Sequence, residues 1–384
     1  MKKILLIHNK YQLIGGEDIA VENEAKFLKK NFNVKELYFD NKINNLISQL
    51  FYFLLNQNFS SIKKIKKEII DFDPDVIYIH NTWFKISPGV FKHLLKLNKP
   101  VLLKLHNYRF FCTRSYFSKS HFAKSNFCKS CGSKKNDVGI FNKYYHESFL
   151  KSLLVIKYGK KYFEILKHPD LKILALTNFQ KNFLIDLGIN KEKIFVHRNN
   201  LNTKNRQGKY FESHPYIVYA GRISNEKGVE IILEAYLNSK INKKFRLKII
   251  GDGPDFLRLN KKYDKYNIDF LGQVNNLETL KIISRSKAVV TATLLQEGQP
   301  TLLCEASLLG IPSIFPQNES ICEFFPKDYP LIFESNNKKD LENKFNKLES
   351  NLDFEKIGLE NKEYMKKILE PKQYLLNFNQ IINS

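Results

Sequence analysis

The sequence has 384 residues, of which 43% are apolar and 13% aromatic, while Gly and Pro contribute only 16 and 12 residues. This composition excludes a disordered or collagen-like chain, and the length favours two domains over one hydrophobic core. The net charge of +23 is unevenly distributed, because residues 1–200 hold 35 Lys and Arg against 16 Asp and Glu, a surplus of 19.

Neither a membrane span nor an export signal is expected. No run approaches about 18 consecutive apolar residues, and the apolar run near the start, Ile4 to Ile7, is short and ends at His8. The five cysteines are too few for a disulfide scaffold in so long a chain. We therefore expect reduced cysteines and a cytoplasmic protein.

The first half alternates between strand and helix patterns. Lys3 to His8 is a short apolar run, Gly15-Gly16 follows it, and Ala20 to Leu28 has apolar residues at helical spacing, which predicts a strand, a glycine loop and a helix. Further buried strands are expected at 76–79, 101–105 and 173–176. Strands that alternate with helices predict a parallel sheet.

A polar stretch, residues 199–214, has the composition of a linker, and a second alternation follows it, with strands expected at 216–220, 247–250, 268–271, 288–291 and 312–315. The predicted fold is α/β, with two Rossmann-like domains that face each other across a cleft. The expected domains are 1–204 and 205–362, and a C-terminal helix, 363–384, returns to the first. Ligands of such sheets bind beyond the carboxyl ends of the strands, so we expect them in this cleft.

Two carboxylates separated by seven residues mark the segment from Glu297 to Glu305. Pro300 is typical of the first turn of a helix, which puts Glu297 in the loop ahead of the helix and Glu305 about one turn inside it. The backbone N–H groups at such a helix start suit a phosphate. Two surface glutamates at this spacing are also common, so the segment alone does not decide between the two interpretations.

The segment from Gly221 to Gly228 directly follows a predicted strand and precedes a predicted helix. Its glycines let the backbone approach a ligand, and Arg222 and Lys227 place two cations where a pyrophosphate would need neutralising. An Arg and a Lys on a loop are otherwise usually solvated, so this segment too has two interpretations.

Together these segments resemble the donor-binding domain of the retaining family-4 glycosyltransferases, which have the two-Rossmann GT-B fold. In order, the motifs are Gly221-Arg222, Lys227-Gly228, Gly251-Asp252-Gly253-Pro254, Glu297 with Glu305, and Gly310-Ile311-Pro312. The first half resembles the bacterial polysaccharide and lipopolysaccharide members of that family, through Gly15-Gly16-Glu17-Asp18, His80-Asn81, and Leu105-His106-Asn107-Tyr108-Arg109 followed by Cys112. The resemblance covers nearly the whole chain.

The resemblance implies that residues 205–362 bind the nucleotide-sugar donor. Arg222 and Lys227 would hold the donor diphosphate. Glu297 would hold the transferred sugar and Glu305 the ribose hydroxyls, with Gly298 and Gln299 at the same sugar and ribose site. Fixed cations and helix-start amides stabilise the charge that develops on a departing diphosphate. We therefore expect no metal ion and no other cofactor.

The first domain would serve the acceptor side. By the same resemblance, His106 would lie against the sugar ring, and the Gly15-Gly16 loop would close over the diphosphate and the acceptor. Retention of configuration usually suggests a carboxylate nucleophile, for which Glu297 is the candidate. In the resembling family that residue binds hydroxyls and the leaving phosphate assists attack from the same face, so we assign Glu297 a positioning role and keep the nucleophile as the alternative.

Two patterns suggest metal binding at first sight. Asp71-Phe72-Asp73-Pro74-Asp75 contains an Asp-x-Asp pattern, but Pro74 between a helix end and a strand start predicts a connecting turn. Cys128-x-x-Cys131, with Cys112, has the spacing of metal ligands, but a histidine such as His121 or His146 would have to complete a zinc site. We predict no metal there.

The sequence is thus interpreted as a retaining glycosyltransferase that moves a sugar from a nucleotide-diphosphate donor to a saccharide or lipid-linked acceptor in cell-surface polysaccharide synthesis. One alternative is a nucleotide-sugar epimerase of the same fold. Another is a basic nucleic-acid-binding protein without activity, although the aromatic-flanked Arg clusters expected of one are not apparent. We expect no nucleic-acid partner.

The basic first half predicts contact with an anionic membrane surface. Two segments mix apolar residues with lysines: Leu46, Ile47, Leu50, Phe51, Phe53, Leu54 and Leu55 leading into Lys63-Lys64-Ile65-Lys66-Lys67, and Lys151 to Lys167. Their apolar residues can equally face the core, and both interpretations stand at this point.

Overall fold

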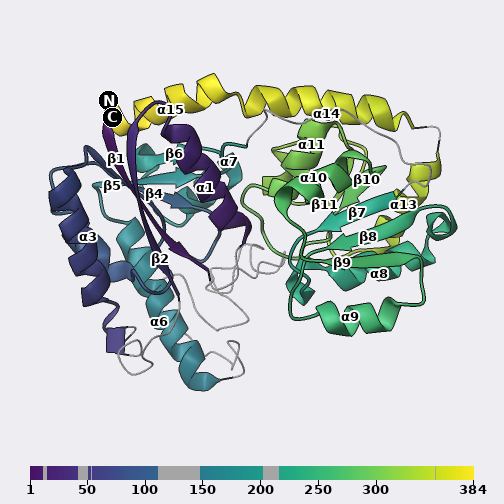
Figure 1. Ribbon diagram of the computed structural model, residues 1–384, viewed down its shortest axis with the longest axis horizontal. Coiled ribbons are helices and arrows are strands. Elements are labelled where there is room, and N and C mark those ends of the chain that lie inside the picture. The colour runs from purple at the N-terminus through teal and green to yellow at the C-terminus, as the bar shows by residue number, and fades with distance from the viewer. Residues whose placement is uncertain (12–14, 42–50, 53, 111–147, 202–215, 351) are drawn as a thin grey trace. The chain divides into compact units, whose positions relative to one another are not determined.

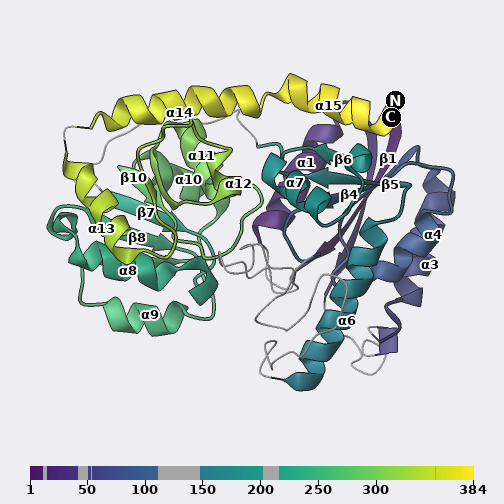
Figure 2. The same ribbon diagram turned by 180° about the vertical axis from the view of Figure 1, so that it is seen from behind.

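The computed structural model describes residues 1–11, 15–41, 51–52, 54–110, 148–201, 216–350 and 352–384. They form two compact units, one made of Met1–Leu201 with Pro371–Ser384 and the other of Asn202–Glu370 (Figure 1). Each unit contains a six-stranded parallel sheet with helices on both faces (Figure 2). The predicted α/β fold with two Rossmann-like domains is confirmed.

The first sheet has the strand order β2-β1-β3-β4-β5-β6, and all neighbouring strands are parallel. The four inner strands are those that the sequence pattern predicts. The elements are β1 (Lys3–Lys10), α1 (Gly16–Leu28), β2 (Asn33–Asp40), α3 (Phe59–Phe72), β3 (Val76–Asn81), α4 (Phe91–Leu94), β4 (Val101–Leu105), α6 (Phe149–Leu166), β5 (Leu171–Ala175), α7 (Asn178–Asp186), β6 (Ile194–Val196) and α15 (Pro371–Asn383).

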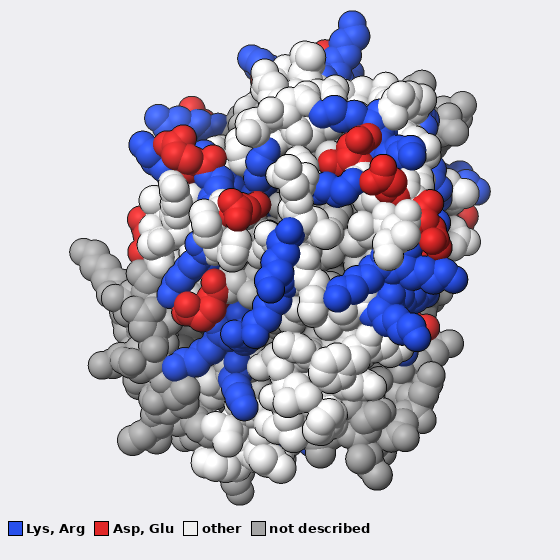
Figure 3. Space-filling view, turned by 90° about the vertical axis from the view of Figure 1, so that its left-hand side faces the viewer, with Lys and Arg blue, Asp and Glu red and all other residues white. Residues whose placement is uncertain are grey.

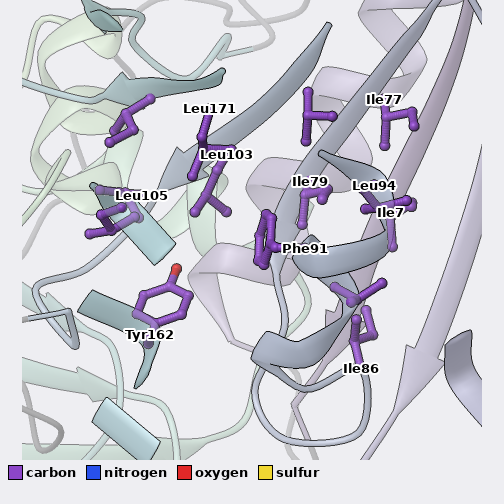
Figure 4. Close-up of a cluster of buried hydrophobic side chains, with 14 of the residues drawn as sticks. Ile7, Ile77, Ile79, Ile86, Phe91, Leu94, Leu103, Leu105, Tyr162 and Leu171 are labelled. Carbon is purple, nitrogen blue, oxygen red and sulfur yellow. The ribbon is translucent and has the colours of Figure 1, made fainter. Parts of the chain in front are cut away.

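Alternate residues of the inner strands pack against helices on opposite faces of this sheet. On one face Ile77 and Ile79 lie in a cluster with Phe91 of α4, as Figure 4 shows. On the other face Val76 and Tyr78 pack against α1 and α15. Complete burial of such a side chain contributes about 1.5–3 kcal/mol. Burial on both faces therefore fixes the inner strands and the residues that follow their carboxyl ends.

The last helix of the chain, α15, completes the first unit rather than the second. Its residues Tyr374, Phe378 and Ile381 are buried in the same cluster as α1. Asn377 Nδ2 donates to the carbonyl oxygen of Val196 at 2.8 Å, and Lys172 Nζ donates to that of Ile381 at 2.9 Å. One face of the first sheet is thus covered by helices from opposite ends of the sequence.

The second sheet has the order β12-β11-β10-β7-β8-β9, again with parallel neighbours. Helix α8 packs with α13, and α11 packs with α10 and α14 on the opposite side of the sheet (Figure 1). The elements are β7 (Tyr216–Ala220), α8 (Val229–Asn238), β8 (Arg246–Ile250), α9 (Phe256–Tyr263), β9 (Ile268–Gly272), α10 (Asn276–Ser284), β10 (Ala288–Val290), α11 (Thr301–Leu309), β11 (Ser313–Pro316), α12 (Glu319–Cys322), β12 (Ile332–Phe333), α13 (Lys338–Asn346) and α14 (Phe354–Ile368).

In each sheet the chain first adds strands on one side of the starting strand and then continues on its other side, so the strand order reverses once. The reversal lies between β1 and β3 in the first sheet and between β7 and β10 in the second. In open parallel sheets, ligands bind beyond the carboxyl ends of the strands at this reversal. The residues that follow these four strands are therefore where each unit should carry its functional groups.

Candidate active site

The loop after β7 is held against the loop after β8 by backbone contacts. Ile223 N donates to the carbonyl oxygen of Asp252 at 2.9 Å. A Cβ at Gly251 would lie 2.0 Å from the carbonyl oxygen of Gly221, and one at Gly253 would lie 2.3 Å from that of Ile223. Only glycine permits approaches this close. The glycines of the 251–254 motif thus fix the backbone that carries Arg222.

Arg222 itself is exposed, and it forms no ion pair with any residue in the described part of the chain. Tyr219 OH donates to its carbonyl oxygen at 2.8 Å, which anchors the backbone and leaves the guanidinium accessible. An unpaired guanidinium beside the strand reversal is suited to an anionic ligand.

Lys227 and Glu297 meet across the reversal between β7 and β10. Lys227 Nζ lies 2.7 Å from Glu297 Oε1, and Thr293 Oγ1 donates to the same carboxylate oxygen at 2.8 Å. The lysine and glutamate side chains are 28% and 20% exposed, so a ligand can reach both. Gly228 has a φ of +65°, and its Cα lies so close to Ala292 that a Cβ would fall 2.0 Å from the Ala292 carbonyl oxygen. This contact brings the two loops together.

Helix α11 begins at Thr301, directly after Pro300, so Glu297 lies in the preceding loop and Glu305 inside the helix, as the sequence predicts. Glu305 is buried, and so are Gly298 and Gln299 in the loop. The Pro300 carbonyl oxygen accepts from Cys304 N at 3.0 Å, which closes the first turn. The amides within this first turn, from Thr301 to Leu303, precede the first intrahelical bond and can donate to an anion.

In the first unit, the glycine turn leads directly into α1. Gly15 N donates to Asp18 Oδ2 at 2.8 Å, and Asp18 Oδ1 lies 2.8 Å from Nε2 of buried His8 at the end of β1. Among the described residues, a Cβ at Gly16 would meet no atom within 4 Å, and one at Gly15 would meet only Asp18 Oδ2, at 3.8 Å. Packing against the described residues therefore does not explain these two glycines.

His80, near the carboxyl end of β3, and His106, directly after β4, form a pair. His80 Nδ1 lies 2.9 Å from His106 Nε2, and the rings stack with centroids 5.2 Å apart. Burial first, and then the ammonium of Lys104, hold the pKa of His80 well below its ordinary value. Burial and then His80 do the same for the pKa of His106. Both rings are therefore neutral at physiological pH.

A chain of polar contacts links the glycine turn to the segment after β4. Tyr11 OH donates to Glu17 Oε2 at 2.9 Å and accepts from Arg109 Nη1 at 3.0 Å, while Asn107 Nδ2 donates to the same Glu17 oxygen at 3.2 Å. Burial raises the pKa of Glu17. The sequence motifs contain Glu17, Asn107 and Arg109 but do not indicate this network, because Tyr11 lies outside them.

A buried charged cluster lies inside the first unit, close to the carboxyl ends of β3 and β4. Lys104 Nζ donates to Glu24 Oε2 at 2.6 Å, Tyr78 OH donates to Glu24 Oε1 at 2.6 Å, and Tyr374 OH of α15 donates to the same oxygen. Burial alone would raise the pKa of Glu24, but Lys104 and neighbouring His197 lower it below its ordinary value. The sequence signal that could have predicted this cluster is Lys104, because a lysine inside an otherwise apolar strand requires a buried acid as its partner.

Of the two segments with the spacing of metal ligands, the structure describes the Asp-x-Asp segment and not the cysteine segment. Asp73 caps α3 and pairs with Lys99 at 2.7 Å, and Asp75 Oδ2 accepts from Lys3 N, so the Asp-x-Asp segment is a connecting turn as predicted. The cysteine segment with Cys112, Cys128 and Cys131 lies outside the described residues. Within those residues, no group of three or more His, Cys, Asp or Glu could hold a metal ion.

The fold of the whole chain is that of the GT-B proteins. Sucrose-phosphate synthase from Thermosynechococcus elongatus superposes with a TM-score of 0.73 at 15% identity, over 100% of this chain and 98% of that one. HepE from Anabaena in complex with UDP-glucose superposes with a TM-score of 0.67 at 14% identity, over 100% of this chain and 99% of that one. The lipopolysaccharide outer core galactosyltransferase WaaB, in its apo form, superposes with a TM-score of 0.62 at 16% identity, over 99% of each chain. These similarities establish the fold.

Within that class, residues 202–366 match the family model described as glycosyl transferases group 1. No curated protein sequence matches the chain significantly. The GT-B fold that the motifs indicate is therefore confirmed over the whole chain, and the match to the glycosyl transferases group 1 model covers residues 202–366, most of the second unit. No helix within the described residues is long and apolar enough to cross a membrane.

Proposed function

We propose that the protein is a retaining glycosyltransferase that uses a nucleotide-diphosphate sugar and a saccharide or lipid-linked acceptor in cell-surface polysaccharide synthesis. The observation that carries the proposal is the arrangement at the reversal of the second sheet. There an exposed Arg222, the Lys227–Glu297 pair and the start of α11 follow two adjacent strands. The solved structure of HepE with UDP-glucose, which has the same fold, supports this class of donor.

In this proposal the bond between the anomeric carbon and the diphosphate oxygen breaks, and the electron pair leaves with the diphosphate. The acceptor hydroxyl oxygen bonds to the same face of the carbon, and its proton passes to the departing diphosphate. Arg222, Lys227 and the α11 amides stabilise the charge that develops there. Since these groups supply the positive charge, the reaction requires no metal ion.

The carboxylates bind hydroxyls rather than attack carbon. Glu297 is held by Lys227 and Thr293, which fixes one of its oxygens and leaves the other for hydroxyls of the transferred sugar. Glu305 is assigned to the ribose, with Gly298 and Gln299 at the same sugar and ribose site. The first unit contributes His106, assigned to the sugar ring, and the Gly15-Gly16 turn, assigned to the diphosphate and the acceptor.

Thermal-shift screening with UDP-, GDP- and ADP-sugars tests the donor class, because a ligand that binds only the folded state raises the unfolding temperature. We expect one nucleotide series to stabilise the protein and transfer to occur only when an acceptor is added. Conversion of the sugar nucleotide without an acceptor would identify an epimerase instead. Retention of RNA without any nucleotide-sugar binding would refute the proposal.

We also propose that the first unit binds an anionic membrane surface, where a lipid-linked acceptor would be present. Lys63, Lys66 and Lys67 are exposed on α3 together with Phe59 and Ile70, and we call these five residues the α3 face. Figure 3, which looks at this side of the unit, shows Lys and Arg side chains spread over it. Each basic residue near an anionic bilayer contributes about 1 kcal/mol.

The two lysine-rich segments differ in how far they support membrane contact. Phe51, Leu54 and Leu55 are exposed, whereas Leu46, Ile47, Leu50 and Phe53 lie outside the described residues. Along α6, Val155, Ile156, Tyr162, Phe163 and Leu166 are buried in the core, and the exposed apolar residues are Phe149, Leu150 and Leu153 near its start. The α3 face is therefore the better candidate.

Sedimentation with liposomes tests the membrane proposal. We expect binding to anionic vesicles, much less to neutral ones, and a steep loss as salt rises. The variant Lys63→Gln, Lys66→Gln, Lys67→Gln should lose most of this binding. Its matched control, Lys261→Gln, Lys265→Gln, Lys281→Gln, removes three exposed lysines of the second unit and should bind as the wild type does. Equal binding to both vesicle types would refute the proposal.

A further inference from the structure

Only one proton can lie between His80 Nδ1 and His106 Nε2. Two neutral imidazoles that meet through Nδ1 of one and Nε2 of the other, at 2.9 Å, share a single N–H···N hydrogen bond. Either His80 donates from Nδ1, and His106 then carries its own proton on Nδ1, or His106 donates from Nε2, and His80 then carries its proton on Nε2. The two arrangements leave different atoms unpaired.

Burial decides between these arrangements. His80 is 3% exposed, and its Nε2 has no hydrogen-bond partner among the described residues. If His80 carried its proton on Nε2, a buried N–H would have no acceptor, which costs about 1–3 kcal/mol. With the proton on Nδ1, only a lone pair is left unpaired, and proteins tolerate an unpaired acceptor more readily than an unpaired donor.

The charges around His80 keep it neutral. Lys104 on β4, His8 on β1 and His197 after β6 all disfavour a second proton on its ring, in addition to burial. The rings of His8 and His80 meet edge to face, with their centroids 6.3 Å apart. His80 therefore acts as a neutral donor and not as a cation.

We propose that His80 fixes His106 as the tautomer with hydrogen on Nδ1. His106 is partly exposed, whereas its Nε2 is occupied by His80. Its free ring nitrogen then presents an N–H to a ligand oxygen, and it does so without a charge. His80 touches no substrate in this scheme and is a positioning residue. The inference rests on the proposed function in one respect, because the oxygen would belong to the transferred sugar.

Nitrogen-15 NMR of the histidine-labelled protein tests the tautomer without any substrate. We expect His106 to show a protonated Nδ1 and a bare Nε2, assigned by comparison with His106→Gln. In His80→Phe, which fills the volume but cannot donate, His106 should move toward the Nε2-protonated form that a free neutral imidazole prefers. A protonated Nε2 in the wild type, or an unchanged tautomer in His80→Phe, would overturn the inference.

A conservative variant separates positioning from folding. The side-chain amide nitrogen of His80→Asn can occupy the place of Nδ1 and still donate, so this variant should keep the wild-type tautomer. In a transfer assay we expect His80→Phe to lower kcat by about ten- to hundredfold with a smaller change in KM, and His80→Asn to recover most of the loss. His168→Phe, at a partly exposed histidine before β5, is the control.

The two measurements can fail independently. The expected NMR signature in a protein that transfers no sugar would leave the tautomer assignment standing and refute the proposed function. Normal sugar transfer with the opposite tautomer would refute the role of His80 alone. Equal loss of kcat in His80→Phe and His80→Asn, with the tautomer unchanged in both, would show a purely structural histidine and overturn the inference.

Discussion

The two units place different chemistry at the same position of a similar sheet. At the reversal of the first sheet, His8 and His80 are buried and bonded to other side chains of the unit, and the nearby charge pair of Glu24 with Lys104 is fully enclosed. At the reversal of the second sheet, the Lys227–Glu297 pair is partly exposed and Arg222 is accessible. At this position the second unit thus offers charge to a ligand, whereas the first offers His80 and His106, which are neutral and firmly oriented.

The largest expected effect concerns the enclosed pair. Lys104→Met leaves Glu24 buried without its counter-ion and should lower the free energy of unfolding of the first unit by about 3–5 kcal/mol. Denaturant unfolding followed by fluorescence measures this directly, because the single tryptophan, Trp83, lies in the first unit.

Two further variants check that explanation. Adding Glu24→Leu to Lys104→Met removes both charges and should recover much of the lost stability. Lys338→Met, which breaks an exposed pair with Glu234 in the second unit, should leave the tryptophan transition unchanged. Wild-type stability in Lys104→Met would show that the enclosed charges do not support the first unit.

The next effect tests the accessible pair of the second unit. Glu297→Ala should lower turnover more than about 100-fold, or about 2.7 kcal/mol, because the transferred sugar loses the carboxylate that orients it. Glu278→Ala, on the exposed surface of α10, is the control and should leave turnover unchanged. Turnover at the wild-type level in Glu297→Ala would remove this residue from the site.

A smaller effect is expected at the accessible cation. Arg222→Ala should weaken binding of the donor nucleotide by about ten- to hundredfold, since hydrogen bonds to charged groups are worth about 1.5–3 kcal/mol. Glu305→Ala should also weaken donor binding, through the ribose. Calorimetric titration measures both. Arg246→Ala, at an exposed arginine on β8 that pairs with Asp269, should bind the donor normally. Unchanged affinity in Arg222→Ala would mean that the second unit does not use this charge.

The smallest expected effect is that of a chelator. If fixed cations and helix amides supply the positive charge in the second unit, excess EDTA should leave the transfer rate largely intact. Measured rates with and without EDTA decide this. Activity that disappears with EDTA and returns with magnesium or manganese would show that the accessible cations alone are not sufficient.

Inner strands could be predicted from the sequence and most edge strands could not. The inner strands β1, β3, β4 and β5 are continuous apolar runs because both of their faces are buried. The edge strand β2 is covered less completely, and its sequence carries charges that hide the pattern. The edge strands β6 and β12 have three and two residues, which is too short to form a pattern. The edge strand β9 was predictable because its residues 268–271 remain mostly apolar.

The same limit applies to the site. The loops that hold Arg222, Lys227 and Glu297 follow from local patterns, because glycines and strand ends are visible in the sequence. The 2.7 Å contact between Lys227 and Glu297 joins residues 70 positions apart and depends on which strands are neighbours. The contact between His80 and His106 likewise depends on β3 and β4 being adjacent.

The position of α15 has a consequence for how the protein is made. Glu24 is synthesised 350 residues before Tyr374, the α15 residue that donates a hydrogen bond to it. At about 5–20 residues per second, a ribosome needs roughly 20–70 s to cover that distance. The second unit is one continuous stretch, Asn202–Glu370, and is complete before α15 is added. The unit that emerges first from the ribosome is therefore the last to be completed, and the part of its sheet face that α15 covers, beside α1, stays exposed until α15 has been made.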